Sequence, residues 1–403
     1  MISMVESLCH QIETICEISN KKDMCIFIHE LLELHHEFAI RMLTDFFTPV
    51  PESLWAPLKG KTQLTGGKLK IYANTFPKLK KTQIALMGLS ESANMFRKYF
   101  YDLAWRFGDI EIADLGNLVE TNDEKQRQFA LSEAVGELLN INVIVVIVGG
   151  NTHATFSHYK AYRQQLEPIE IVNVTPSIDF EEGTPLRQIL IDKPSNLFNI
   201  DFVGTQAYYI SENTASLLEK MYFENHRLGE VRNNIEETEP ILRSSHLLMF
   251  DMNSLRLSDA PGTVSKSPNG LYAEEAARIS RYAGVSNKLS SAFFYGLDDQ
   301  NLDSTSHQLL AQMIWYFIDG VTARYYDHPE TNHPDFLIFR NKLNSTGHEI
   351  TFYKSRKSNR WWMEIPHPYD NKTFFIGCSY KDYELVCNGE MPDRWWRAYQ
   401  RLM

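Results

Sequence analysis

Short apolar runs alternate with amphipathic stretches along most of the chain. Apolar runs bounded by turn residues are typical of strands buried in a parallel sheet, and they occur at residues 83–89, 110–114, 143–148, 169–174, 202–203 with their neighbours, 226–228, 247–251 and 292–295. Stretches with apolar residues at helical spacing lie between them, at residues 93–105, 123–139, 158–165, 211–222, 231–242, 273–283 and 304–326. This alternation predicts a three-layer α/β/α fold with a mostly parallel sheet, helices on both faces and right-handed crossovers.

Residues 1–47 precede this alternation, and we expect them to form a helical N-terminal extension of a main domain at residues 48–330. From residue 24 onward the extension has apolar residues at helical spacing. Four potential metal ligands would share one face of this helix: His29, Glu33, His36 and Glu37. A metal site is one interpretation of this face, and a solvated amphipathic surface is the favoured one.

Residues 331–403 predict a C-terminal α+β tail that packs on the main domain. Its predicted elements are strands at residues 349–353, 361–365 and 374–378 and a helix at residues 393–402. Basic and aromatic residues are mixed at residues 354–362 and 393–397, a composition that suits a surface for an anion or a partner protein. The favoured interpretation is structural: the tryptophans attach the tail to the main domain while the arginines stay in solvent.

The charge balance narrows the classes of function. The formal net charge of −11 argues against broad binding to nucleic acid or to anionic membranes. The chain has no apolar segment long enough for a transmembrane helix, and its N-terminus does not resemble a signal peptide. Five cysteines without a Cys-x-x-Cys pair are typical of reduced thiols. We therefore expect a globular, cytoplasmic protein.

Residues 247–263 carry the most informative polar pattern. An apolar run ends at Asp251, and Asn253 follows two residues later, so both side chains point the same way from a strand. The turn signal Asp259-Ala260-Pro261-Gly262 comes next. Because α/β sheets place ligand sites at the carboxyl ends of their parallel strands, we expect a site around Asp251.

This stretch resembles the arginase, agmatinase and formimidoylglutamase (ureohydrolase) family, where it reads Ser-Phe-Asp-x-Asp-x-x-Asp-Pro, then Ala-Pro-Gly and Gly-Leu. The matching positions are Phe250, Asp251, Ala260-Pro261-Gly262 and Gly270-Leu271. Met249, Asn253 and Arg256 stand where the family has Ser, its second metal-binding Asp and its third Asp. The resemblance covers about residues 80–330 and implies an arginase-like fold. The C-terminal tail resembles that of a formimidoylglutamase-like subgroup in Bacteroidetes.

The resemblance also implies a chemistry that needs two manganese ions with a bridging water. Paired metal ions lower the pKa of this water, so that hydroxide attacks a guanidinium or formimino carbon near neutral pH. Six ligands on three strand-end motifs hold the ions: one His, then an Asp-x-His-x-Asp, then an Asp-x-Asp. Carboxylates and imidazoles are suitable ligands for manganese.

Most of these ligand positions carry neutral residues in this chain. The six positions fall on Thr152, Thr175, Ser177, Asp179, Asp251 and Asn253. Asn151 replaces the Asp before the first ligand, and His153 comes one position late, as expected of a residue at the start of the next helix. The family's substrate-binding Glu falls on Gly296 or Leu297. Two carboxylates of six ligands remain, which provide too few donors and too little negative charge for a binuclear centre.

The favoured hypothesis is a pseudoenzyme, a non-catalytic relative of the ureohydrolases with no cofactor. Its metal-free pocket, with Asn151, His153 and Arg256 nearby, would bind an unidentified small molecule or protein partner in a regulatory or scaffolding role. Asp251 would then have a structural role as an acceptor for turn amides before Pro261. The family's usual trimers make a homo-oligomer a further expectation.

The alternative hypothesis is an enzyme that hydrolyses C–N bonds in a formimino or guanidino substrate. It would use an atypical manganese site, for which the candidate residues are His153, Asp179, Asp251 and Asn253. A single weakly held cation between Asp179 and Asp251 is the simplest form of such a site.

Overall fold

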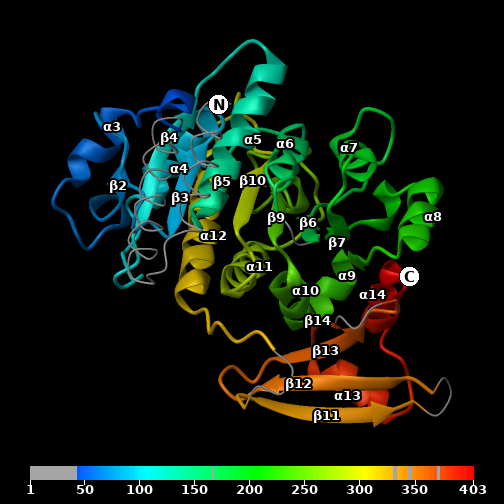
Figure 1. The fold of residues 1–403 in the computed structure, drawn as a ribbon. Coiled ribbons are helices and arrows are strands. Elements are labelled where there is room, and N and C mark those ends of the chain that lie inside the picture. Colours follow the sequence, from blue (N-terminus) through cyan, green and yellow to red (C-terminus); the bar gives the residue numbers. More distant parts are fainter. Residues whose placement is uncertain (1–42, 166–167, 330–333, 344–346, 370–372) are drawn as a thin grey trace, which may run out of the picture.

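The computed structural model describes residues 43–403 except 166–167, 330–333, 344–346 and 370–372. Its centre is a ten-stranded sheet in the order β1-β4-β3-β5-β10-β9-β6-β7-β8, with β2 paired to β4 (Figure 1). The strands are β1 (Phe47–Thr48), β2 (Lys70–Ile71), β3 (Ile84–Gly88), β4 (Ile112–Leu118), β5 (Ile144–Val148), β6 (Ile169–Val174), β7 (Leu197–Thr205), β8 (Asn225–Arg227), β9 (Leu247–Asp251) and β10 (Ser291–Tyr295). Only the pairing of β1 with β4 is antiparallel among these described strands, so the predicted parallel sheet is confirmed.

Helices cover both faces of this sheet. They are α3 (Glu52–Trp55), α4 (Glu91–Phe100), α5 (Glu124–Asn140), α6 (Ala154–Lys160), α7 (Pro185–Ile191), α8 (Glu212–Met221), α9 (Leu228–Asn233), α10 (Thr238–Ser244), α11 (Ala273–Val285) and α12 (Ser304–Thr322). Alternate strand residues point to opposite faces, so Phe250 and Phe294 pack with α4, α10, α11 and α12, whereas Met249 and Phe293 pack with α5, α6, α7 and α8. This arrangement confirms the three-layer prediction. Among the described residues, no helix has the length and apolar character to cross a membrane.

The structure differs from the predicted elements mainly where segments are short. The helix predicted at residues 231–242 is instead α9 and α10, separated by the 3₁₀ turn Ile235–Glu237. At the end of α9, Asn234 has φ −143° and ψ 60°, values outside the helical region. The pattern did not predict β1, β2 or α7, which are too short to show a clear period. The predicted N-terminal helix with His29, Glu33, His36 and Glu37 lies almost wholly outside the described residues.

The C-terminal residues form a second, antiparallel sheet with its own core. Its order is β11 (Phe336–Lys342), β12 (Glu349–Ser355), β13 (Trp361–Pro366) and β14 (Thr373–Cys378), followed by α13 (Tyr380–Cys387) and α14 (Asp393–Leu402). The three predicted strands and the terminal helix are confirmed, whereas β11 and α13 were not predicted. Trp361, Met363 and Trp395 are buried in this core. Cys378 and Cys387 are free thiols.

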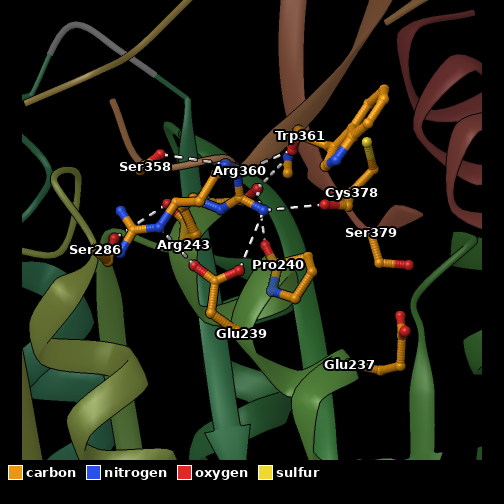
Figure 2. Close-up of polar contacts among 12 residues, drawn as sticks. Glu237, Glu239, Pro240, Arg243, Ser286, Ser358, Arg360, Trp361, Cys378 and Ser379 are labelled. Atoms are coloured by element: carbon orange, nitrogen blue, oxygen red, sulfur yellow. Dashed lines mark hydrogen bonds and ion pairs between the residues drawn. The ribbon is translucent and has the colours of Figure 1, made fainter. Parts of the chain in front are cut away.

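Helix α10 attaches this sheet to the main domain (Figure 2). Arg243 of α10 is buried and donates hydrogen bonds to the carbonyl oxygens of Trp361 (2.9 Å) and Cys378 (3.0 Å). Glu239 forms ion pairs with both Arg243 (3.2 Å) and Arg360 (3.3 Å). The centre of the Trp362 ring lies 4.3 Å from the Arg243 guanidinium, so Trp362 has the structural role predicted for the tryptophans. The prediction that the arginines stay in solvent is wrong for Arg360, whose side chain is only 14% exposed.

Candidate functional site

Four neighbouring parallel strands, β5, β10, β9 and β6, end at the same edge of the main sheet (Figure 1). The ends of these strands and the segments that follow them contain all six ligand positions of the family motifs. Thr152 follows β5, residues 175–179 follow β6, Asp251 ends β9 and Tyr295 ends β10. The alternation of strands and helices therefore places these residues where α/β sheets bind ligands.

Asp251 and Asn253 are joined by hydrogen bonds. Asp251 Oδ1 accepts from the backbone amide (2.9 Å) and the side-chain Nδ2 (2.7 Å) of Asn253, and Asn253 Oδ1 accepts from the amide of Ser265 (2.8 Å). Gly296 packs against this pair, because a Cβ there would overlap the Asp251 carboxylate. Burial raises the pKa of Asp251 to about 6, although the hydrogen bonds from Asn253 lower it. Asp251 therefore accepts a turn amide, as its structural interpretation expects.

Thr152 lies against Tyr295, the last residue of β10. Burial and the nearby Asp251 carboxylate raise the pKa of the Tyr295 phenol well above its ordinary value, although a hydrogen bond with the Thr152 side chain lowers it. Asn151 Oδ1 accepts a hydrogen bond from the amide of His153 (3.0 Å). His153 is exposed and directly precedes α6, as expected of a helix-start residue.

A pocket of about 500 Å³ opens beside residues 175–179. Buried Thr175 donates a hydrogen bond to the carbonyl of Ser177 (2.9 Å), and exposed Asp179 accepts one at Oδ1 from the amide of Glu181 (2.8 Å). The pocket is rich in hydroxyl groups, and its lining includes Ser177, Asp179, Glu181, Tyr209, Thr214 and Ser265. Because Ser265 also bonds to Asn253, the pocket adjoins the turn that holds Asp251.

Arg256 has contacts of its own away from this pocket. Its Nε donates to Asp259 Oδ1 (2.8 Å), and its guanidinium lies 4.1 Å from the centre of the Tyr272 ring. Asp259 Oδ2 in turn accepts from the amide of Ala273, the first residue of α11 (2.9 Å). Arg256 thus helps Asp259 to hold the start of this helix, and it is not among the residues that line the pocket beside residues 175–179.

The residues at the strand ends do not fit a binuclear manganese centre. Asp179 is exposed and bonded to its own loop, Asp251 is bonded to Asn253, and the other four positions have neither a carboxylate nor an imidazole. Within the described part of the chain, a cluster of three potential ligands lies elsewhere, at Asp201, Glu224 and His226. Sequence reasoning missed it because its only signal is polar residues at alternate positions of two separate strands.

The comparisons with known proteins agree with this fold. A model described as the arginase family matches residues 85–294. Formimidoylglutamases of Streptococcus pyogenes serotypes M49 (strain NZ131) and M1 are 26% identical over 137 residues, which is 30% of this chain. The matching stretch spans 42% of the length of these curated relatives.

Solved structures resemble the chain at low sequence identity. Trypanosoma cruzi formiminoglutamase with Mn²⁺ has a TM-score of 0.58 at 18% identity and covers 65% of this chain and 99% of its own. Formimidoylglutamase from Bacillus subtilis has a TM-score of 0.57 at 16% identity, covering 66% and 94%. These similarities show the fold.

Proposed function

Because the chain belongs to the arginase family, we propose that it is a non-catalytic member whose strand-end pocket binds a small polar ligand in a regulatory or scaffolding role. The hydrogen bonds between Asp251 and Asn253 carry this proposal. The side-chain amide of Asn253 donates to Asp251 and accepts from the amide of Ser265. This neutral group therefore links the Asp251 carboxylate to the Ser265 loop, whereas a second carboxylate would need a cation or a shared proton to lie beside Asp251.

The pocket beside this turn favours a ligand with an amino or guanidino group. Ser177 and Thr214 supply hydroxyls that can donate or accept hydrogen bonds. Asp179 and Glu181, both exposed, add two negative charges at the pocket. We propose that such a ligand is recognised here without being hydrolysed.

A hydrolysis assay tests the non-catalytic part of the proposal. The protein is incubated with Mn²⁺ and either a guanidino or a formimino substrate, and urea or formamide is measured. We expect release equal to that of a protein-free blank. Turnover that disappears in Asp251→Asn would overturn the proposal, because it would show that this carboxylate still serves a catalytic centre.

A calorimetric titration with agmatine, a guanidino amine, tests the binding part. We expect saturable binding that Asp179→Asn weakens about tenfold, since the variant loses a charged hydrogen-bond partner. Glu182→Gln is the matched control: Glu182 is exposed on the same loop but does not line the pocket. An absence of agmatine binding, or equal effects of the two variants, would contradict the proposed ligand class.

The alternative is a C–N hydrolase with an atypical metal site, and the two carboxylates at Asp179 and Asp251 are the observation in its favour. Metal analysis of purified, tag-free protein separates the two hypotheses. If the protein is a hydrolase, the unmodified protein should contain manganese and the Asp251→Asn variant should not. If the protein is non-catalytic, the Asp251→Asn substitution should leave its manganese content unchanged.

A further inference from the structure

One edge of the main sheet places five polar side chains on a single face. The pairing of β6 with β7 sets Glu170 beside Asn199, and the pairing of β7 with β8 sets Phe202 beside Asn225 and Val203 beside His226. Asp201 is therefore beside Glu224 in register. Because side chains alternate along a strand, Glu170, Asn199, Asp201, Glu224 and His226 all point to the same side.

Three of these side chains converge. One potential ligand atom from each of Asp201, Glu224 and His226 lies within 4.8 Å of the other two. Asp201 is 6% exposed, and the side chains of Glu224 and His226 are 15% and 23% exposed. A cavity of about 30 Å³ lies beside Asp201 and Glu224, covered by α10 and by Ile376 and Gly377 of the C-terminal sheet. This volume is enough for one ion or water.

Two buried side-chain atoms of this cluster have no hydrogen-bond partner. Asp201 accepts from Asn199 Nδ2 at Oδ2 (2.9 Å), but its Oδ1 is buried and unpaired. His226 Nε2 is also buried without a hydrogen-bond partner, and Glu224 Oε2 is 3.6 Å from it. Native proteins rarely leave such atoms unsatisfied, because each costs free energy. A group that accepts electron pairs from a carboxylate and an imidazole together would satisfy both atoms.

Neither arginine at the cavity makes a hydrogen bond with the unpaired atoms of Asp201 and His226. Arg394 and Arg401 border the cavity but have other partners: Arg394 pairs with Asp382 (3.4 Å), and Arg401 donates to the carbonyl of Tyr222 (2.6 Å).

We propose that Asp201, Glu224 and His226 bind one divalent transition-metal ion, for which Zn²⁺ is the best match, beneath the C-terminal sheet. Two carboxylates and one imidazole form a mixed oxygen and nitrogen set that suits Zn²⁺, with a water completing four ligands. The strands that carry these ligands lie beyond β6, away from the strand ends around Asp251. The ion would join the edge strand β8 to β7 and neutralise the buried carboxylates. This inference is independent of the proposed function.

Metal titration of tag-free protein tests the inference. After dialysis against a chelator, the protein is titrated with ZnCl₂, and bound zinc is counted by mass spectrometry. We expect one Zn²⁺ per chain and a Tm that rises by a few degrees on binding. Asp201→Asn and His226→Gln should each weaken binding at least about tenfold, because each removes one of three protein ligands. Asp251→Asn is the matched control and should bind zinc as the unmodified protein does.

The variants also separate a lost site from a lost fold. Asp201→Asn removes a buried, poorly paired charge, so its circular dichroism and its Tm in chelator should equal or exceed those of the unmodified protein. The inference is overturned if the unmodified protein binds no zinc, or if Asp201→Asn and His226→Gln bind it with unchanged affinity. Zinc lost in Asp251→Asn but kept in Asp201→Asn would place the ion at the strand ends and also overturn it.

Discussion

Replacing Asp251 with asparagine tests whether this carboxylate is a structural group in a metal-free turn. Burial raises its pKa from 3.8 to about 6 in the folded protein. Between these two pH values the folded state keeps a proton that the unfolded state has released, so the contribution of Asp251 to stability falls as pH rises through this window. At about 1.4 kcal/mol for each pKa unit, the loss approaches ~3 kcal/mol above pH 7.

Asparagine has nearly the same shape and no charge to desolvate. Its side-chain oxygen can accept the same two hydrogen bonds from Asn253. We therefore expect Asp251→Asn to stabilise the protein by about 1–3 kcal/mol at pH 8, with the gain disappearing near pH 4. Partial access of water to this side chain sets the lower end of the range.

Urea denaturation at several pH values measures this difference. Other titrating groups, including Asp201, are present in both proteins, so their effects cancel in the comparison at each pH. Asp179→Asn is the matched control, because Asp179 is an exposed carboxylate on a neighbouring strand end and its removal should change stability by less than about 0.5 kcal/mol at every pH. A clear destabilisation by Asp251→Asn at pH 8, or a pH-independent effect, would refute the reasoning.

Two further predictions concern close packing at the turn and attachment of the C-terminal sheet. Gly296→Ala should destabilise the protein by more than about 2 kcal/mol, because Gly296 has a φ of +93° and an added Cβ would overlap Asp251. Gly183→Ala is the control for backbone strain alone, because Gly183 has a φ of +87° and an added Cβ would have no atom within 4 Å. Arg243→Ala should cost about 3 kcal/mol or more, because it removes two buried hydrogen bonds to carbonyl groups and an ion-pair partner of Glu239. The exposed ion-pair residue Arg278 can be replaced by alanine for less than about 1 kcal/mol. Urea denaturation of each variant and its control measures the change in the free energy of unfolding. If a variant and its control lose the same stability, the physical reason given for that variant is contradicted.

The central fold could be predicted because its determinants are local. The runs at residues 143–148 and 247–251 are apolar at every position except the last of the second run, as required of strands covered on both faces. The structure places them as β5 and β9, on either side of β10. The positions of Asp251 and Asn253 at a strand end followed from the same pattern.

Other features depend on contacts between distant segments and could not be predicted. Asp201 and His226 become neighbours only through the register of β7 with β8, which one sequence does not reveal. The roles of Arg243 and Arg256 depend on carbonyl and carboxylate partners that only the folded chain identifies. The hydrophobic pattern shows which face of a helix or strand is buried. It does not show which polar group of another element a side chain on that face will contact.

Asn253 shows how a family fold can change its chemistry while keeping its shape. Its Nδ2 lies 2.7 Å from Asp251 Oδ1, so an aspartate at this position would bring two carboxylates into contact. We expect Asn253→Asp to destabilise the protein by about 1–3 kcal/mol at pH 8, and Mn²⁺ to restore part of this loss by bridging the two carboxylates. Urea denaturation with and without Mn²⁺ measures both effects, and Asn269→Asp, on an exposed loop, is the control. If Asn253→Asp were as stable as the unmodified protein without metal, the amide would not be the group that holds this turn.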